Sequence, residues 1–154
     1  ALDVTIQAQI LELVKQLKDE FNMAMIWITH DLGVVAGLSD NIQVMYAGKI
    51  VERGPTKEVF QDTRSAYTLG LLRSLPRLDG SNTKLIQIEG SPPDMRIPPK
   101  GDPFAPRNPY ATDRCWVDAP ELKAVEGGQP DHMVAAWYDL RAALKAEQEA
   151  AAHV

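Results

Sequence analysis

The chain has 154 residues, of which 45% are hydrophobic, and it carries a formal net charge of -5. This size is enough to bury a core, while the acidic balance disfavours nucleic acid as a partner, because phosphate binding needs an excess of Lys and Arg. The longest apolar run is far shorter than the ~20 residues of a membrane-spanning helix, and the single cysteine, Cys115, cannot form an internal disulfide, so we expect a cytosolic globular protein.

The first forty residues predict a helix, a strand and a second helix. Apolar residues recur at helical spacing over residues 4–21, which indicates an amphipathic helix. Residues 23–29 then form a continuous apolar run that is too short for a helix and lacks alternation, so they predict a central parallel strand covered on both faces. A short helix is expected over residues 32–38. His30 and Asp31 precede it, at the strand end where open α/β sheets place ligand sites.

The middle of the chain predicts a hairpin followed by two short helices. Residues 42–46 and 49–53 are strand-like runs separated by Ala47 and Gly48, which suits a two-residue turn. Thr56 with the apolar residues after it indicates a short capped helix, and residues 67–75 indicate another that stops at Pro76.

Proline changes the character of the sequence in its second half. Seven of the eleven prolines lie between positions 92 and 109, so this stretch should be extended and rich in turns. We therefore place a boundary near residues 75–79. Residues 133–138 suit a short strand. Residues 140–152 suit an Ala/Glu-rich helix that is marginal unless it docks on the rest of the protein.

His30 is the most informative candidate for chemistry, because an imidazole at a strand end can point into a phosphate-binding cleft. The alternative is a solvated or backbone-bonded histidine, with Asp31 merely capping the next helix. We expect His132 and His153 to be solvated and Cys115 to be a structural or incidental thiol. No Cys or His pair has the spacing of a metal site, and no phosphate-binding glycine loop of the G-x-x-x-x-G-K-[ST] type occurs.

Three motifs resemble, in order and spacing, the distal half of an ABC ATPase domain: ALD at residues 1–3, ITHDL at 28–32 and MYAGKIVERG at 45–54. The runs ALDVTIQAQILEL at 1–13 and YTLGLLRSLP at 67–76 are similar to the dipeptide, oligopeptide and nickel importer subfamily. So is the tail GSPPDM…PFAPRNPYATDRC over residues 90–115. The resemblance implies an α/β fold: the C-terminal part of a P-loop NTPase domain, lacking the Walker A and Walker B strands, followed by a Pro-rich irregular extension.

By this resemblance two residues have assigned roles. Asp3 matches the D-loop aspartate at the interface of two nucleotide-binding domains, and His30 matches the switch histidine of the H-loop, which contacts the γ-phosphate. In the family the residues that hold ATP and Mg²⁺ lie upstream of the D-loop. We therefore expect ATP and Mg²⁺ to bind only in a complete subunit, and this chain to be an inactive piece of an ATPase when alone.

The resemblance also implies the domain organisation. Residues 1–76 correspond to the distal half of the nucleotide-binding domain, 77–139 to the importer-type C-terminal extension, and 140–154 to a terminal helix or tail. Without the neighbouring Walker strands, a strand over residues 23–28 would leave backbone groups unpaired. We therefore expect the isolated chain to be unstable, aggregated or rearranged unless the N-terminal half of its own domain completes the sheet.

Many relatives have four cysteines in the tail, in a pattern suited to an iron–sulfur cluster. One thiolate cannot hold such a cluster, so none is expected here. We expect the Pro-rich segment to pack through its aromatic residues instead, which are Phe104, Tyr110, Trp116 and Trp137. The residues at the four cysteine positions are Asp102, Asn108, Cys115 and Ala136.

The favoured hypothesis is a part of the ATP-binding subunit that energises peptide import, working with a second ATPase subunit and two membrane permeases. Such a subunit is cytoplasmic and peripheral on the cytoplasmic face of the cell membrane. A second hypothesis is a non-catalytic interaction or regulatory module derived from that subunit. A third, a small hydrolase using His30 and Asp31, is disfavoured because adjacent residues do not form an oriented nucleophile–base pair.

Overall fold

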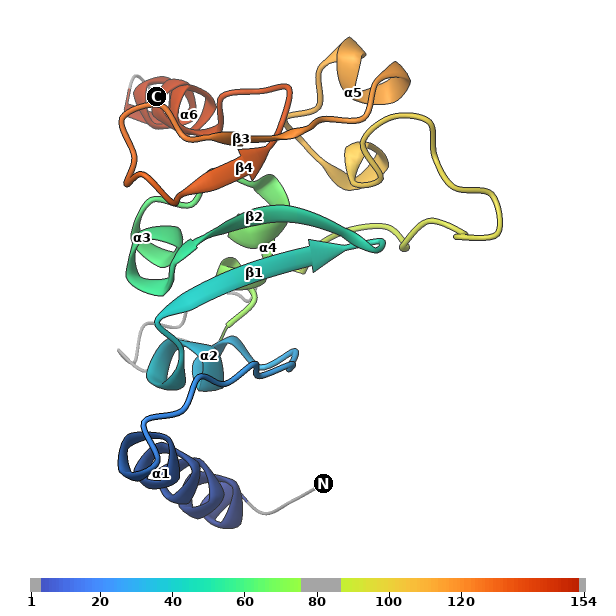
Figure 1. Ribbon diagram of the computed structural model, residues 1–154. Helices are drawn as coiled ribbons and strands as arrows, with labels where there is room; N and C mark the ends of the chain where they lie inside the picture. The colour runs from blue at the N-terminus through green and yellow to red at the C-terminus, as the bar shows by residue number, and fades with distance from the viewer. Residues whose placement is uncertain (1–3, 76–86, 153–154) are drawn as a thin grey trace. The chain divides into compact units, whose positions relative to one another are not determined.

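An antiparallel sheet with the strand order β1-β2-β4-β3 forms the centre of residues 41–154 in the computed structural model (Figure 1). The structure describes residues 4–75 and 87–152. Contacts divide the chain into a first unit, Ala1–Asp40, and a second unit, Asn41–Val154. The expected α/β class is confirmed. The strands are β1 (Asn41–Tyr46), β2 (Lys49–Pro55), β3 (Leu122–Ala124) and β4 (Met133–Ala135).

The predicted hairpin is confirmed in β1 and β2. Ala47 and Gly48, the two residues between the strands, both have positive φ angles, of 47° and 75°. Two consecutive positive φ angles are typical of the turn whose twist matches that of paired strands. Along β1 buried and exposed residues alternate, and Ile42, Val44 and Tyr46 face the core. The hairpin therefore has one face in the core and one face in solvent.

A bulge in β2 changes which side chains are buried. Val44 is paired with Glu52 but Met45 with Ile50, so Val51 is the extra residue. A bulge breaks the strict alternation of faces, and both Val51 and Glu52 are buried. The carboxylate of Glu52 consequently lies in the interior.

The helices of the second unit follow the sequence prediction closely. Helices were expected after Thr56 and over residues 67–75 and 140–152, and all three are present. Pro55 occupies the N-cap of the first of them. The strand expected over residues 133–138 is shorter, since β4 ends at Ala135. The helices are α3 (Thr56–Gln61), α4 (Ala66–Arg73), α5 (Asp113–Val117) and α6 (Leu140–Ala152), with a short 3-10 helix over Ala105–Arg107.

The buried carboxylate of Glu52 connects three parts of the chain. Its Oε1 lies 2.9 Å from Nε2 of His132 and accepts a 2.7 Å hydrogen bond from the backbone N–H of Arg64. Its Oε2 accepts a 3.2 Å bond from the backbone N–H of Ser65, directly before α4. Both side chains of the Glu52–His132 pair are 0% exposed. The prediction that His132 is solvated is therefore wrong, because a buried partner 80 positions away holds the imidazole inside.

Aromatic packing fixes the later part of the Pro-rich segment against the hairpin. The rings of Tyr46, Tyr67 and Phe104 lie with centroids 4.6–5.3 Å apart. The guanidinium of Arg107 lies over the Tyr46 ring, and it donates hydrogen bonds to the Tyr46 hydroxyl and to the carbonyl oxygen of Ile88. The expected packing role is thus met by Phe104.

Trp116 and Trp137 differ in their surroundings. Trp116 is 57% exposed, so the prediction that it packs in this segment is wrong. It lies on the short helix α5, whose buried face is occupied by Cys115. Trp137 does pack, because the Arg114 guanidinium lies 3.4 Å from its ring centroid and its indole N–H donates to the carbonyl oxygen of Asp118.

The first unit contains the expected helices α1 (Val4–Glu20) and α2 (Leu32–Leu38). The prediction of a buried strand over residues 23–29 is wrong, since this segment forms neither strand nor helix, and Ile26 and Ile28 are 91% and 94% exposed. A strand needs a neighbour that accepts and donates its backbone hydrogen bonds, and none of the described residues supplies one to this segment.

Among residues 4–75 and 87–152, no helix combines the length and apolar content needed to cross a bilayer.

Replacing Glu52 with Ala should destabilise the second unit strongly. The change leaves two backbone N–H groups and the His132 imidazole without their acceptor, and each orphaned buried polar group costs about 1–3 kcal/mol. We expect a loss of at least ~3 kcal/mol in the free energy of unfolding, measured by urea denaturation. Glu121→Ala, at an exposed position, is the control. Equal stability of the two variants would contradict the role assigned to Glu52.

Candidate functional site

His30 lies on a turn whose backbone is fixed on both sides. The Thr29 hydroxyl accepts a 3.0 Å hydrogen bond from the backbone N–H of Asp31. The Asp31 carboxylate in turn accepts bonds from the backbone N–H groups of Gly33, at 2.9 Å, and Val34, at 3.3 Å. The capping role considered for Asp31 is therefore confirmed. His30 itself is exposed, so its imidazole is available to a ligand and can donate one hydrogen bond to an anion.

The other residues singled out by motif or residue type lie outside the described residues or in the second unit. Asp3, the second predicted site residue, lies outside the described residues, as does His153. His132 is enclosed in the core of the second unit, with Glu52. The boundary predicted near residues 75–79 also falls largely outside the described ranges. Within the described residues, the sequence-predicted site therefore consists of His30 and the turn that carries it.

Three of the four positions matching the family cysteines are buried side chains of the Pro-rich segment. The Asp102 carboxylate accepts a 2.9 Å bond from the backbone N–H of Phe104, and the Asn108 side-chain oxygen accepts one of 2.9 Å from Tyr110. Cys115 is fully buried, and its carbonyl oxygen accepts from the backbone N–H of Asp102. Burial raises the pKa of Asp102. These side chains support the local turns, and the expectation that no iron–sulfur cluster is held here stays a prediction.

A cluster that the sequence analysis missed brings Glu58, Asp62 and His132 together, with one possible metal-ligating atom from each within 4.8 Å of the others. Spacing of four residues between Glu58 and Asp62 was a visible signal, but the contribution of His132 was not, because it comes from a distant loop. Both Asp62 oxygens already accept hydrogen bonds from Arg64, at 3.0 and 2.7 Å, and one also accepts from Arg141, at 2.9 Å. The arginines thus satisfy Asp62 and Glu52 pairs with Nε2 of His132, whereas Nδ1 of His132 is buried and has no hydrogen-bond partner among the described residues.

The charge of Asp62 depends on its two arginines. Burial alone would raise its pKa, but hydrogen bonding and the positive charge of Arg64, helped by Arg141, outweigh burial and hold the pKa below its ordinary value. The same hydrogen bonds and charge raise the pKa of Arg64. Asp62 is thus ionised at neutral pH and ties the end of α3 to α6.

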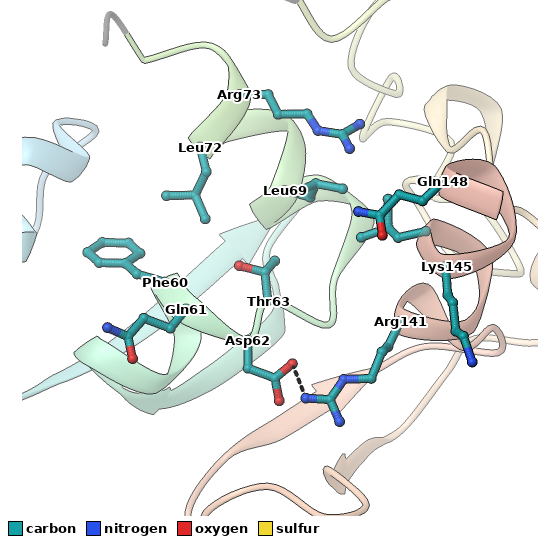
Figure 2. A pocket seen from close by; sticks show the side chains of 11 residues that line it. Phe60, Gln61, Asp62, Thr63, Leu69, Leu72, Arg73, Arg141, Lys145 and Gln148 are labelled. Carbon is teal, nitrogen blue, oxygen red and sulfur yellow. Dashed lines mark hydrogen bonds and ion pairs between the residues drawn. The ribbon is translucent and has the colours of Figure 1, made fainter. Parts of the chain in front are cut away.

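A groove of about 540 Å³ lies next to this ion pair, between α3, α4 and α6, and Figure 2 shows side chains that line it. Figure 2 shows Leu69 and Leu72 on α4 and Arg141 of α6 directed at Asp62. Leu144 of α6 also lines the groove. Every lining residue is half-buried or exposed, so the groove is open to solvent. The lining residues are Phe60, Gln61, Asp62, Thr63, Leu69, Leu72, Arg73, Arg141, Leu144, Lys145 and Gln148.

Most of the chain is similar to the C-terminal part of one group of transport proteins. Residues 51–115 match the family described as the oligopeptide/dipeptide transporter, C-terminal region. Over 129 residues the chain is 50% identical to the oligopeptide transport ATP-binding protein OppD of Haemophilus influenzae, and over 138 residues it is 50% identical to that of Bacillus subtilis. It is also 46% identical over 137 residues to the dipeptide transport ATP-binding protein DppD of Lactococcus lactis.

The matched region is most of this chain but less than half of each relative. They cover 84% of this chain and 40% of the Haemophilus influenzae protein. For the Bacillus subtilis and Lactococcus lactis proteins they cover 89% of this chain and 38% of the relative. The chain therefore spans about two fifths of the length of the curated relatives it matches.

Asp62→Asn should lower stability in a pH-dependent way. Because the pKa of Asp62 is lowered on folding, its contribution is present at neutral pH and is lost as the pH falls through the pKa of the folded state. Urea unfolding should therefore show Asp62→Asn less stable than the parent chain at pH 7, with the gap narrowing in acid. Glu126→Gln, at an exposed position, should show no such gap. A gap that is constant with pH would contradict the assigned ion pairs.

Proposed function

We propose that this chain, which is homologous over most of its length to the C-terminal part of the ATP-binding subunits of oligopeptide and dipeptide importers, acts as the distal part of an ABC-type ATPase that drives peptide import. The observation that carries the proposal is His30, exposed on a rigid turn that follows an unpaired apolar segment. In a P-loop NTPase sheet the apolar segment would be a central strand, and His30 would lie at the end of that strand.

In this proposal residues 23–29 become a strand when the rest of the ATPase domain is present. The segment is not committed to a helix, and its backbone groups have no strand partner among the described residues. Ile26 and Ile28 are almost fully exposed, and burying each is worth roughly 1.5–3 kcal/mol. Insertion between two strands would satisfy both needs at once. The part of the relatives that lies outside the matched region is the natural source of those strands.

His30 then contributes to phosphoryl transfer by position and polarity. A neutral imidazole has one ring N–H that donates to a phosphate oxygen, while the other nitrogen accepts a hydrogen bond. Phosphoryl transfer depends mainly on positioning and on stabilising charge at the phosphate oxygens. The Thr29 and Asp31 hydrogen bonds fix the backbone from which the imidazole projects. In this proposal the remainder of the subunit binds ATP and Mg²⁺, and Asp3 lies at the interface with a second ATPase subunit.

The whole assembly in this proposal contains a second ATPase subunit and two membrane permeases, on the cytoplasmic face of the membrane. The relatives' names point to oligopeptides or dipeptides as cargo. A second candidate is a non-catalytic interaction module. The observation favouring it is that residues 41–154, which contain the family match, form a unit with its own core, separate from the unit that carries His30.

The strand assignment is tested by complementation. The part of the Bacillus subtilis relative that precedes the matched region is co-expressed with this chain, and co-purification is measured. We expect capture of the parent chain and its loss in the double variant Ile26→Asp, Ile28→Asp, because two carboxylates cannot enter a sheet interior. Ile97→Asp changes an equally apolar residue, 79% exposed in the second unit, and should leave capture intact. Capture that is unaffected by the double variant would overturn the assignment.

The His30 role is tested in the same reconstituted subunit. His30→Ala should reduce ATP hydrolysis by about a hundredfold or more, the effect of losing one donor to developing charge, while nucleotide binding measured by fluorescence titration stays within a few-fold. Gln43→Ala, at an exposed position in β1, is the control. Normal turnover by His30→Ala would remove His30 from the mechanism and leave the interaction module as the better reading.

A further inference from the structure

The imidazole of His132 has a hydrogen-bond partner on only one of its ring nitrogens. Nε2 lies 2.9 Å from Oε1 of Glu52, whereas Nδ1 is buried and has no partner among the described residues. The side chain is 0% exposed. A buried polar atom without a partner is rare in folded proteins, and it calls for an explanation such as a bound ion or a functional role.

Glu52 determines which nitrogen of His132 carries the proton. Its carboxylate accepts hydrogen bonds from two backbone N–H groups, and it is likewise the acceptor for Nε2 of His132. When one nitrogen of a neutral imidazole donates, the other has a free lone pair. Metal-ligating histidines are held in this way, with one ring nitrogen bonded to a carboxylate and the other facing the metal. Nδ1 of His132 is therefore prepared to act as a ligand.

The backbone around His132 holds the imidazole in a fixed place. Its N–H donates a 2.9 Å bond to the carbonyl oxygen of Gln129, and its own carbonyl oxygen accepts a 2.8 Å bond from Val125. A Cβ atom at Gly54 would lie 3.0 Å from the Cα of His132, so the absence of a side chain there lets this loop pack directly on β2. A ligand held rigidly in advance loses little conformational freedom on binding.

Two carboxylates lie beside the imidazole of His132. Glu58 in α3 and Asp62 at its C-cap are four residues apart, a spacing that puts both on one face of the helix. One ligand atom from each of the three residues lies within 4.8 Å of the other two. Carboxylate oxygens and the lone pair of Nδ1 are all acceptors, so they cannot bond to one another. A cation between them satisfies all three.

Both carboxylates have capacity left for a metal. Oδ1 of Asp62 accepts two hydrogen bonds, from Arg64 and Arg141, but Oδ2 accepts only one, from Arg64. Each carboxylate oxygen has two lone pairs, so one on Oδ2 is open. Glu58 is half-buried, and its carboxylate has no hydrogen bond or ion pair within residues 4–75 and 87–152.

The arginines that pair with Asp62 do not cancel the negative charge of this region. The negative charges of Asp139 and Glu52 also act on Arg64, and Glu58 adds another carboxylate. Of these described groups, four are carboxylates, whereas two guanidinium groups oppose them. A divalent cation therefore enters a region with a negative balance of charge.

We propose that Nδ1 of His132 and the carboxylates of Glu58 and Asp62 bind a divalent transition-metal ion such as Zn²⁺. One imidazole nitrogen with two carboxylate oxygens is a ligand set suited to Zn²⁺, whereas Mg²⁺ and Ca²⁺ take oxygen ligands. Three protein ligands leave the fourth position of a tetrahedral ion to water. The ion joins α3 to the loop before β4, so its role is to stabilise the second unit.

Glu58 is the ligand that moves when the ion binds. Ligand atoms of a tetrahedral Zn²⁺ site lie roughly 3.3 Å apart, given Zn–ligand distances of about 2.0–2.2 Å, so the cluster has to contract from 4.8 Å. His132 is fixed by its backbone and by Glu52, and Asp62 by its arginines. The half-buried Glu58 side chain is free to rotate toward them.

The test is a titration of the metal-free 154-residue chain with Zn²⁺ in a calorimeter. We expect one saturable site for each chain at micromolar Zn²⁺, and no binding of Mg²⁺ at the same concentrations. His30 is exposed and offers Zn²⁺ another imidazole, so ¹⁵N NMR of the histidine side chains assigns the site. Zn²⁺ should shift Nδ1 of His132 and leave Nε2 protonated. A shift confined to other histidines, or no shift at all, would overturn the proposal.

Substitution of Glu58 tests the site without disturbing the Glu52–His132 pair. Glu58→Gln removes a charged ligand that has no described partner, and it should weaken Zn²⁺ binding tenfold or more, about 1.4 kcal/mol. Glu126→Gln, the same change at an exposed position, should leave the affinity unchanged. Zn²⁺ should also raise the urea midpoint of the parent chain, because it binds only the folded state, and raise that of Glu58→Gln much less. Equal Zn²⁺ affinity of the two variants would remove Glu58 from the site and overturn the proposal, without touching the role of His30.

Discussion

The second unit is organised around a buried carboxylate, that of Glu52. A carboxylate enclosed in protein is costly unless donors surround it, and here two backbone N–H groups and an imidazole do so. These donors come from the turn before α4 and from the loop before β4. The bulge at Val51 is what directs Glu52 inward. The bulge in β2, the turn before α4 and the loop before β4 are therefore held together by one buried carboxylate.

Local patterns in the sequence predicted the elements whose stabilising partners are near in sequence. The hairpin, α1 and α6 were expected within a few residues of their actual bounds, because hydrophobic periodicity and turn residues depend on near neighbours. His132 was misjudged, since its proline-flanked loop suggests exposure and its partner Glu52 lies 80 positions away. Residues 23–29 were misjudged for the opposite reason. The pattern reports that the segment suits a sheet interior, but forming a strand requires a neighbour, and no described strand lies beside it.

The sequence likewise predicted one part of the candidate site and missed another. His30 was found from residue type and motif, and the capping bonds of Asp31 followed from its place before an expected helix. The groove had no local signal, because its lining is drawn from residues 60 to 148. Single leucines and arginines on separate helices are unremarkable until the helices are packed. The ion pair of Asp62 with Arg64 could be predicted because the two residues are two positions apart. The ion pair of Asp62 with Arg141 could not, because Arg141 is distant in the sequence.

The uncovered apolar segment before His30 calls for one particular kind of partner. Residues 24–29 have no strand partner among the described residues, Ile26 and Ile28 are exposed, and only another strand satisfies backbone donors and acceptors in regular order. A surface of that kind is completed during folding and stays covered.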